Sequence, residues 1–392
     1  MKEAKSKSSG KKQRIDWVRE NCRLLALTAA EFQQTQPFAG KTIGTGIHLE
    51  PKTAALLLTL KAGGARVIAT GNLSSTQPET VFYLKERGVE VFARQTRNAE
   101  EHTANLDNIL NQRPDILLDN GGDLFARYLE KPYPGLMGGT EETTSGRIRL
   151  LPLRDQLRMP ILVINDSPIK QFAENKHGVG QSVMESYLRF TNRITNGQRI
   201  TVFGYGSCGR GVADYFRSCK AIVSVVDADP LKTLEAHLDG FLTPYRGDAV
   251  RSADVIITVT GVKEILQEDV LEQLKDGTVL ANAGHFPWEI DVEGIENSSN
   301  VQAVEMYEDD ITTWILVDGR KIHLLGRGHM MNLAGPRPLG NTIEVMDMGF
   351  TLQSRCLEAV ASGTVGQDHC VVTVPETINI AVAETYLELV RS

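Results

Sequence analysis

A glycine-rich turn between an apolar segment and a helical segment constrains the fold of this chain more than any other feature. Gly204, Gly206 and Gly209 form a G-x-G-x-x-G pattern within GYGSCGRG, after the apolar segment RITVFGYG and before RGVADYFRSC. The first glycine permits a tight turn, the second lets the backbone approach a pyrophosphate, and the third lets the helix pack closely. The phosphates then lie at the helix N-terminus, where backbone N–H groups point toward them. This context predicts a dinucleotide-binding turn, to which Ser207 and Cys208 also belong.

An acidic residue after the next predicted strand favours one dinucleotide. The segment AIVSVV ends at Asp227, which follows Gly204 at about the expected spacing of ~20 residues. A carboxylate there accepts hydrogen bonds from the adenosine ribose and repels the 2′-phosphate of NADP. We therefore predict a Rossmann domain that binds NAD. Two further predicted strands, DVIITVTG and GTVLANAGH, end in residues that we expect on the nicotinamide side: Thr258, Thr260, Ala283, Gly284 and His285.

The preceding part of the chain alternates short apolar segments with helical ones. Strands are predicted at KTIGTGIHL, RVIATG, VEVFAR, DILLD and ILVIND, with helices at PKTAALLLTLKAGGA and PETVFYLKERG. Such alternation indicates βαβ units and a parallel sheet covered on both faces, so the fold class is α/β. Ligands of open α/β sheets bind outside the carboxyl ends of the strands. The polar residues at those ends are therefore the first candidates for chemistry: His48, Asn72, Asp119, Asn120, Asn165 and Asp166.

Composition excludes several classes of protein. The 392 residues carry a formal net charge of -7, with 41% hydrophobic and 23% charged residues, which is typical of a globular chain of two or three domains. No apolar run approaches the ~18 residues of a membrane span, and the basic start MKEAKSKSSGKKQR lacks the apolar stretch of a signal peptide. We predict a disordered basic tail over 1–14, a cytoplasmic protein, no membrane contact and no nucleic-acid partner.

The cysteines predict neither disulfides nor a metal site. There are five, an odd number, and no pair has C-x-x-C spacing. Free thiols are the expectation for such a pattern. No His/Cys cluster has the spacing of zinc ligands, so no metal is predicted.

Segments spread along the chain, from about residue 23 to 390, resemble those of the S-adenosylhomocysteine hydrolases. In order they are GIHLEPKTA, GNLSSTQ, LDNGGDL, GTEETTSG, INDSPIKQFAENKHGVGQS, GYGSCGRG, NAGHFPWEID and MNLAG. The short C-terminus and HLE-x-KTA are similar to the shorter bacterial and archaeal branch. The Lys- and Tyr-containing tail with which the longer branch reaches the NAD of a neighbouring subunit has no counterpart here.

The resemblance implies a domain arrangement and a reaction. A discontinuous substrate-binding domain, about 15–180 plus 340–392, closes over an NAD-binding domain at 181–339, and the enzyme is a homotetramer or homodimer. In the family reaction, tightly bound NAD oxidises the 3′-carbon of a nucleoside ribose. The ketone acidifies the 4′-hydrogen, the group on C5′ leaves, water adds, and NADH reduces the ketone again, so that the cofactor is regenerated in each turnover.

The same resemblance assigns catalytic roles. Glu142 matches the glutamate that binds the ribose diol, and Lys170 matches the lysine of 3′ proton transfer, whose pKa we expect to be lowered near NAD⁺. Glu174 lies where the family has an aspartate near C4′, and His48 and His285 match histidines around C5′. Taken singly, each has an ordinary interpretation: a strand-end histidine, a surface lysine or a helix-capping glutamate. Their joint placement in matching segments favours the catalytic interpretation.

Further residues match binding positions. The expected contacts of the substrate domain with NAD are Thr143, Thr144, Ser145 and Asn175, and Asn332 is expected to orient the nicotinamide. The expected substrate contacts are Glu50, Lys52, Thr53, Asp119, Thr143, Leu333, Arg337 and Met346. Glu50 and Lys52 lie where this branch contacts the purine edge, and both adenine and hypoxanthine stay open as bases. For Arg337, the sugar, the tail of the substrate and solvent stay open as surroundings.

Three departures from the family pattern fall in the site itself. The second of the family's paired aspartates before GGD, which serves acid/base work near C5′, is Asn120 here, and an amide cannot exchange a proton in that way. The family's Gly-His-Pro turn after the NL motif is replaced by NLAGPRPLGNTIEVMD, which is about two residues longer, lacks histidine and contains Arg337. The aspartate near C4′ is Glu174, and the tyrosine after it is His177.

These departures spare the oxidation residues and alter the C5′ end. The sequence therefore predicts an NAD-dependent enzyme that oxidises the 3′-OH of a purine nucleoside and eliminates the C5′ substituent. One hypothesis is a dehydratase or lyase that releases a 4′,5′-unsaturated nucleoside, and the alternative is an S-adenosylhomocysteine hydrolase. A catalytically inactive NAD-binding regulator and a simple dehydrogenase are the remaining possibilities.

Overall fold

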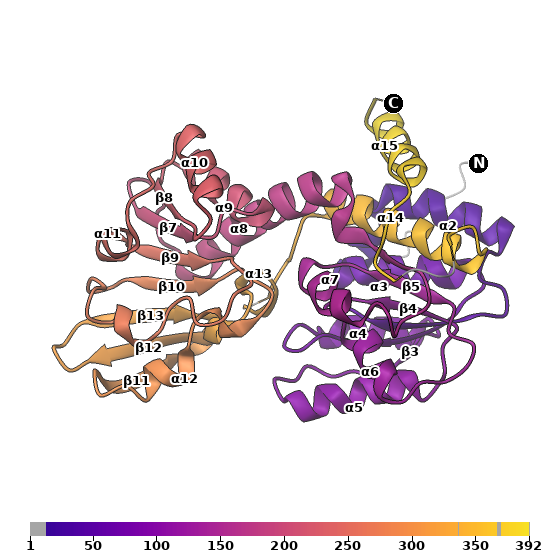
Figure 1. Cartoon of the computed structure of the whole chain (residues 1–392), viewed down its shortest axis with the longest axis horizontal. Coiled ribbons are helices and arrows are strands. Elements are labelled where there is room, and N and C mark those ends of the chain that lie inside the picture. The colour runs from indigo at the N-terminus through magenta and orange to yellow at the C-terminus, as the bar shows by residue number, and fades with distance from the viewer. Residues whose placement is uncertain (1–12, 336, 367–369, 392) are drawn as a thin grey trace, which may run out of the picture.

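The molecule consists of two lobes, each built around a seven-stranded sheet (Figure 1). The computed structural model describes residues 13–335, 337–366 and 370–391. The first sheet has the order β14-β6-β5-β4-β1-β2-β3, and each adjacent pair is parallel. Its strands are β1 (Thr42–Gly46), β2 (Arg66–Thr70), β3 (Glu90–Val91), β4 (Ile116–Asp119), β5 (Gly138–Glu141), β6 (Ile161–Val163) and β14 (Val372–Thr373).

The two helices that the sequence predicts in this lobe are present, although α4 (Pro78–Glu86) ends before the predicted Gly88. In α3 (Pro51–Ala62), proline occupies the first turn, where its missing N–H costs nothing, and Gly63 follows the last residue. Residues far apart in sequence share this lobe, because α14 (Ile343–Ala361) packs on α2 and α3. The helices of this lobe are α1 (Arg14–Asn21), α2 (Arg23–Thr35), α3, α4 (Pro78–Glu86), α5 (Ala99–Leu110), α6 (Asp123–Glu130), α7 (Thr144–Leu150), α14 and α15 (Glu376–Arg391).

The second lobe has the order β11-β12-β13-β10-β9-β7-β8. The five strands from β13 to β8 are parallel, whereas β11 and β12 add an antiparallel edge. The strands are β7 (Arg199–Phe203), β8 (Ile222–Val226), β9 (Val255–Thr258), β10 (Val279–Asn282), β11 (Val301–Tyr307), β12 (Ile311–Leu316) and β13 (Lys321–Leu325). The helices are α8 (Val179–Thr191), α9 (Ser207–Ser218), α10 (Pro230–Leu238), α11 (Arg246–Ser252), α12 (Val292–Glu296) and α13 (Met331–Ala334).

A π-helix leads from the first lobe to the second. It spans Lys170–Gly178 and continues into α8, which packs closely on α9. A Cβ on Gly211 of α9 would lie 1.9 Å from the carbonyl oxygen of Lys176, so glycine is required at this crossing. π-helical turns are rare and are frequent at functional sites. Here the wide turn carries Lys170, Glu174 and Asn175 on one buried side.

The α/β class predicted from the sequence is confirmed, and three details differ. Strand β5 lies within GGTE, which has too few apolar residues to predict a strand, and β11–β13 form an antiparallel extension that the motif search did not reveal. The predicted strand VEVFAR is reduced to Glu90–Val91 at the edge of the sheet. Of the predicted tail, residues 1–12 lie outside the described residues, and Arg14 already begins α1.

Candidate functional site

The glycine-rich turn has the spacing that a pyrophosphate requires. Gly204 has φ +102°, and a Cβ on Gly209 would lie 2.0 Å from the carbonyl oxygen of Gly204, so helix and strand are in contact at these two positions. A Cβ on Gly206 would meet nothing within 4 Å. The open space at the second glycine and the N-terminus of α9 beside it fit a bound phosphate.

Asp227 is held against this turn. Its Oδ2 accepts a hydrogen bond from the Tyr205 N–H at 2.7 Å, and its Oδ1 accepts one from the Asp229 N–H at 2.9 Å. The carboxylate lies just beyond the end of β8 and is only partly buried. It is therefore fixed in place and accessible to the ribose hydroxyls of a dinucleotide.

Two alanine variants should separate phosphate contact from loop packing. Gly206→Ala should leave the melting temperature of cofactor-free protein unchanged and weaken NAD binding at least about tenfold, because the methyl group enters only the space for the ligand. Gly209→Ala should lower both, since its methyl group overlaps backbone. Calorimetry of NAD binding and thermal melts measure the two effects. Unchanged NAD affinity in Gly206→Ala would contradict this placement.

The strand ends on the nicotinamide side are organised by Glu289, which motif reasoning missed. Its Oε2 accepts hydrogen bonds from the Thr260 N–H and hydroxyl, both at 2.8 Å, and its Oε1 accepts one from the Gly261 N–H at 2.7 Å. A Cβ on Gly284 would lie 1.6 Å from the Glu289 Oε1, which explains this glycine. Thr258 is likewise engaged, since its hydroxyl donates to the Asn282 Oδ1 at 3.1 Å. These threonines shape the loops, and Ala283 is buried beside them.

Asn332 presents a free acceptor. Its Nδ2 donates to the Ser182 hydroxyl at 2.9 Å, whereas its Oδ1 is buried without a hydrogen-bond partner among the described residues. Such an unmet acceptor is costly unless a ligand satisfies it. The amide N–H groups of a nicotinamide carboxamide have the matching chemistry.

Glu142, Lys170 and Glu174 form a buried charge cluster. The Lys170 Nζ lies 3.5 Å from the Glu142 Oε1 and donates a hydrogen bond to the Glu174 Oε1. All three residues are at most 6% exposed. The Glu174 Oε2 has no hydrogen-bond partner in the described structure and faces Gly349, where a Cβ would lie 2.7 Å away. The cluster therefore brings together three of the predicted catalytic residues and keeps one carboxylate oxygen available.

The two carboxylates set the direction of the Lys170 pKa shift. Burial by itself lowers the pKa of Lys170, but the neighbouring Glu174 and Glu142 carboxylates outweigh burial and raise it. The lowered lysine pKa expected beside NAD⁺ stays a prediction, since these carboxylates raise the pKa in the protein alone. Burial raises the pKa of Glu174 to about 7, against the opposing effect of Lys170. Glu174 rather than Lys170 is thus the group that titrates near neutral pH.

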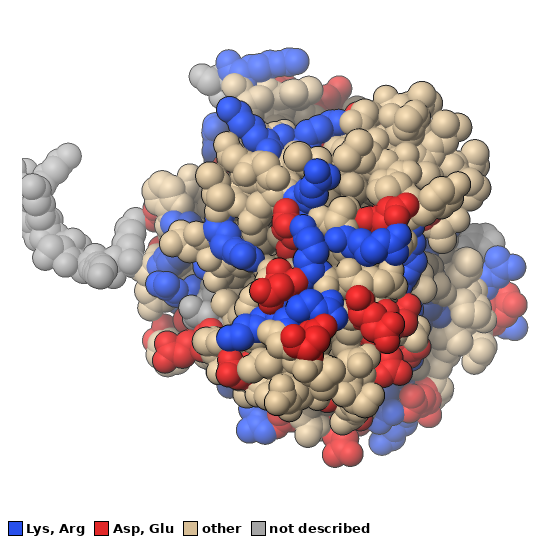
Figure 2. All heavy atoms as spheres, turned by 90° about the vertical axis from the view of Figure 1, so that its left-hand side faces the viewer, with Lys and Arg blue, Asp and Glu red and all other residues tan. Residues whose placement is uncertain are grey.

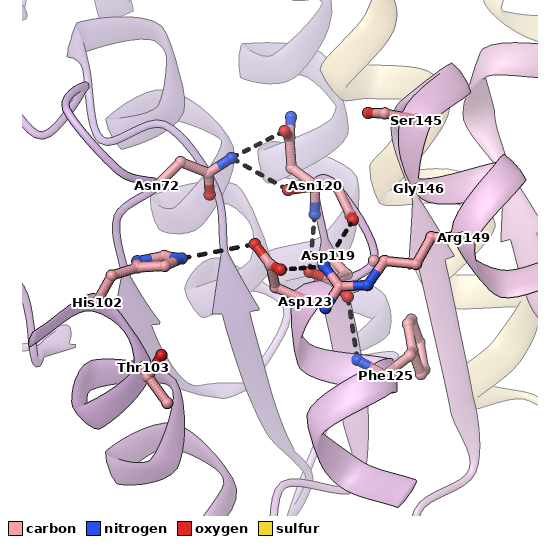
Figure 3. Close-up of polar contacts among 12 residues, drawn as sticks. Asn72, His102, Thr103, Asp119, Asn120, Asp123, Phe125, Ser145, Gly146 and Arg149 are labelled. Atoms are coloured by element: carbon pink, nitrogen blue, oxygen red, sulfur yellow. Dashed lines mark hydrogen bonds and ion pairs between the residues drawn. The ribbon is translucent and has the colours of Figure 1, made fainter. Parts of the chain in front are cut away.

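Asn120 is locked by hydrogen bonds on both sides of its amide. Its Nδ2 donates to the Glu142 Oε2 at 2.7 Å, and its Oδ1 accepts from the Asn72 Nδ2 at 2.9 Å. Figure 3 shows Asn72 reaching both the side chain and the backbone carbonyl of Asn120. With the amide donating to the Glu142 carboxylate, Asn120 has no proton to exchange and no freedom to turn.

The two predicted histidines approach each other from different lobes. The ring centroids of His48 and His285 are 6.2 Å apart, and the His48 Nδ1 lies 2.5 Å from the Ser75 hydroxyl. Burial lowers the pKa of His48 to about 3, assisted by His285 and Lys170, and burial also lowers the pKa of His285. His48 is therefore neutral at physiological pH, whereas at His285 the Asp123 and Glu142 carboxylates oppose the effect of burial.

Asp119 holds the backbone that carries Asn120. It is fully buried, and its two oxygens accept hydrogen bonds from the backbone N–H groups of Asn120 at 3.0 Å and Phe125 at 3.1 Å. We therefore assign it to holding the Asn120 turn instead of to substrate contact. Glu141, opposite it on β5, accepts from the Gly121, Gly122 and Thr143 N–H groups at 2.8–3.0 Å.

Thr143 and its neighbours belong to the start of α7. The Thr143 hydroxyl donates to Glu141 at 2.7 Å, caps the Gly146 N–H at 2.9 Å and lies 3.0 Å from the Ser145 hydroxyl. Thr144 is the first residue of the helix. These contacts describe a helix whose first turn is capped by Thr143, and the cofactor contact of these residues stays a prediction.

Other residues predicted to contact the cofactor form hydrogen bonds around the π-helix. Asn175 donates to the Asn165 Oδ1 at 3.0 Å, and the Ser207 hydroxyl donates to the Gln171 Oε1 at 2.5 Å, joining α9 to the π-helix. Burial raises the pKa of the Cys208 thiol to about 11, so the thiol is neutral.

The predicted purine-edge residues form a buried ion pair. The Lys52 Nζ lies 2.7 Å from the Glu50 Oε2 and donates to the Leu339 carbonyl oxygen at 2.5 Å. Thr53 is buried and donates to the His48 carbonyl oxygen. Met346 is buried, whereas Leu333 is partly exposed and borders Gly340.

Arg337 lies at the surface. Its side chain is exposed, its φ is +45°, and its carbonyl oxygen accepts a hydrogen bond from Arg189. Of the three surroundings that the sequence left open, solvent is the one observed, so Arg337 is not placed as a substrate contact. The flanking segment instead reaches the first lobe through its backbone, because the Pro338 carbonyl oxygen accepts from the Gln77 Nε2 at 3.2 Å.

Positive and negative side chains are mixed on the face of the second lobe that points away from the first lobe. Figure 2 shows Lys and Arg interleaved with Asp and Glu across the middle of that face, without a continuous basic patch. No helix among the described residues is long and apolar enough to cross a membrane. All five cysteines are free thiols, and the described residues contain no group of three His, Cys, Asp or Glu placed to hold a metal ion.

Comparisons with known proteins identify the family. The family model described as S-adenosyl-L-homocysteine hydrolase matches residues 1–133, and the model for its NAD binding domain matches residues 175–337. An S-inosyl-L-homocysteine hydrolase of Methanopyrus kandleri is 38% identical over 381 residues, covering 95% of this chain and 89% of the relative. The chain belongs to the S-adenosyl-L-homocysteine hydrolase family. It is an NAD-dependent enzyme of that family, and NAD is its cofactor.

Relatives named for a different substrate are equally similar. An adenosylhomocysteinase of Thermococcus kodakarensis is 38% identical, covering 97% of this chain and 90% of the relative. One of Thermotoga maritima is 40% identical, covering 87% and 85%. Identity therefore does not discriminate between the two substrates named for these family members.

A solved structure supports the fold alone. A dipicolinate synthase chain from Bacillus halodurans has a TM-score of 0.50 and 12% identity, covering 83% of this chain and 99% of that one. A likeness at this identity reports the arrangement of the two lobes and no activity.

Sequence reasoning missed several residues of the site. Glu141 and Glu289 are buried carboxylates that hold loops, and Asp123 acts electrostatically on His285. Each belongs to a quoted segment, so the signal was present. Their roles depend on contacts between segments that spacing along the chain does not reveal.

Proposed function

We propose that this family member oxidises the 3′-hydroxyl of a purine nucleoside and eliminates the group on C5′, releasing a 4′,5′-unsaturated nucleoside. The observation that carries the proposal is the locked Asn120 amide beside an otherwise complete Glu142–Lys170–Glu174 cluster. The residues for the first half of the family reaction are together, and the aspartate that the family has at position 120 is replaced by asparagine. In terms of domains, we propose 15–180 plus 340–392 for the substrate and 181–339 for NAD.

The residues fit NAD on three independent features. They are the open space at Gly206, the fixed carboxylate of Asp227 and the unmet acceptor of Asn332. When bound, NAD supplies a reversible oxidation of the sugar that makes the neighbouring C–H bond acidic.

The cluster residues bind the ribose and move its protons. Glu142 accepts the hydrogen bonds of the ribose diol, because its Oε2 is turned to Asn120 and its Oε1 is only loosely engaged by Lys170. Lys170 lies between the two carboxylates and passes the 3′-hydroxyl proton between them. Glu174, with a pKa near 7 and an unpartnered oxygen, takes the 4′ proton.

At the C5′ end, the same network disfavours the addition of water. Activating water requires a group that accepts its proton, and the Asn120 amide cannot do so. The His48 Nδ1 already contacts the Ser75 hydroxyl, and burial lowers the pKa of His48 to about 3. His48 is therefore a weak base for water. With His285 left as the one histidine that exchanges a proton at C5′, we expect the unsaturated nucleoside to be released faster than it is hydrated.

A panel of nucleosides with a C5′ hydroxyl or thioether tests the proposal. Mass spectrometry should detect a product lighter than its parent by one water or one thiol, with no external NAD consumed. Hydrolysis of S-adenosylhomocysteine or S-inosylhomocysteine at an ordinary rate, with no alkene, would contradict it.

Hydrolysis is the second candidate, and the relatives favour it. The named relatives are S-inosyl-L-homocysteine hydrolases and adenosylhomocysteinases at 38–40% identity over most of the chain. Detection of free homocysteine from either substrate would support this candidate, and the same panel would identify the base.

The pH dependence of the first half should report Glu174. Only the carboxylate accepts the 4′ proton, and burial raises its pKa to about 7, so the rate of 4′-hydrogen exchange with solvent deuterium should rise as the pH increases through about 7. NMR of the nucleoside over a pH series measures this exchange. Glu174→Gln should remove it, and a flat profile across neutral pH in the unaltered enzyme would assign the base elsewhere.

A further inference from the structure

A second polar cluster lies beside the site, on the first turn of α6. Asp123 begins this helix, and its Oδ1 forms an ion pair with Arg149 while its Oδ2 lies 3.5 Å from the His102 Nε2. The Arg149 Nη1 also lies 3.5 Å from the Gly121 carbonyl oxygen. Figure 3 shows His102 and Arg149 approaching the Asp123 carboxylate from opposite sides, below Asn120. Asp123 is therefore held in one orientation by two cations or donors.

The cluster faces His285 across the gap between the lobes. A Cβ on Gly121 would lie 3.2 Å from the His285 Nε2 and 3.9 Å from the Asp123 Oδ2. The imidazole edge and the carboxylate thus border the same small space, which only glycine leaves open. Asp123 is the next carboxylate along the chain after position 120, where the acid/base group has been lost.

The charges around both groups favour an ionised Asp123. Burial raises the pKa of Asp123, but the His102 hydrogen bond and Arg149 lower it further than burial raises it. Burial and Lys170 lower the pKa of His285, and Asp123 and Glu142 raise it. The centroid of the neutral His48 ring lies 6.2 Å from that of His285. Of the two carboxylates, Glu142 is already committed to Asn120 and Lys170.

We propose that Asp123 is a positioning residue that holds the His285 imidazole so that its Nε2 delivers a proton to the leaving group on C5′. The inference rests on the proposed function and deepens it. In the step, the electron pair of the C4′–H bond forms the C4′=C5′ bond, and the 4′ proton goes to Glu174. The C5′–O electron pair stays with oxygen, which takes the proton from His285 and leaves as water. Solvent then restores the proton of His285 and removes that of Glu174.

Asp123→Asn tests this role without changing shape. Exchange of the 4′ hydrogen with deuterium should stay within about twofold of the unaltered enzyme, because it precedes the C5′ step. Alkene release should fall at least roughly tenfold. The alkaline limb of the pH profile for alkene release by Asp123→Asn should move to lower pH by roughly half a unit or more. Loss of the Asp123 carboxylate destabilises the protonated form of His285.

A matched control and an activity-independent measurement separate the outcomes. Glu130→Gln removes a carboxylate from the other end of α6, where it pairs with Arg127 at the surface, and should change neither rate nor profile. NMR titration of His285 in the cofactor-loaded enzyme should give a lower pKa in Asp123→Asn than in Glu130→Gln. Equal His285 titration in both, or an equal fall of exchange and alkene release, would overturn the role of Asp123. Absence of exchange and alkene in the unaltered enzyme would instead refute the proposed function, and the titration alone would then decide on Asp123.

Discussion

Lys170→Met should abolish 4′-hydrogen exchange by nucleosides, lowering the rate by about 10²–10⁴. Lys170 is the one cation in contact with both Glu142 and Glu174 among the described residues. Without it, the two buried carboxylates lose their shared partner, and the ribose proton has no route between them. Deuterium exchange at C4′ in the NAD-loaded variant measures the loss.

The same substitution should destabilise the protein by about 3–5 kcal/mol, because it leaves buried charge without compensation. Protonation of Glu174, whose pKa burial raises to about 7, lessens that cost, so the melting temperature should recover as the pH is lowered through about 7. Lys176→Met is the matched control, since this lysine of the same π-helix pairs with Asp214 in a half-exposed position. Exchange near the unaltered rate in Lys170→Met would refute the assigned role of the cluster.

Asn120→Asp should change the product instead of merely slowing the enzyme. The new carboxyl group would lie within hydrogen-bond distance of the Glu142 Oε2, at the present 2.7 Å contact, so the pair must share a proton. A group that can exchange a proton would then stand at the C5′ end. We expect hydrated nucleoside to rise by roughly 10² relative to alkene.

Incubation of the alkene with each variant in heavy-oxygen water makes the change visible. Asn120→Asp should incorporate the label at C5′, and the unaltered enzyme should not. Asn111→Asp introduces the same charge at an exposed position after α5 and should behave as the unaltered enzyme does. Equal label in all three proteins would show that Asn120 does not control hydration.

The nucleotide half of the site was predictable because its physics is local. The glycine spacing, the strand before it and Asp227 after it follow from backbone geometry within one βαβ unit, and the structure gives each glycine a distinct steric reason. The α/β class followed in the same way from alternating apolar segments.

The substrate half was predictable in composition but not in electrostatics. Spacing could place Lys170 and Glu174 one turn apart, yet the raised lysine pKa depends on Glu142 arriving from a different strand. Asp119 and Asn120 are adjacent in sequence. The Asp119 carboxylate accepts hydrogen bonds from backbone N–H groups, whereas the Asn120 side chain donates to Glu142 in the site. Arg337 had no periodic pattern to orient it, and only the fold placed its side chain at the surface.

The central claim is that the sugar is oxidised at C3′ before any bond at C5′ breaks. Its most direct test is the near-ultraviolet absorbance of reduced nicotinamide on the NAD-loaded enzyme, free of external cofactor, after a purine nucleoside or its 3′-deoxy analogue is added. The nucleoside should reduce the bound NAD and yield a C5′ product, whereas the 3′-deoxy analogue should do neither. Conversion of the 3′-deoxy analogue at the same rate as the nucleoside would contradict the account.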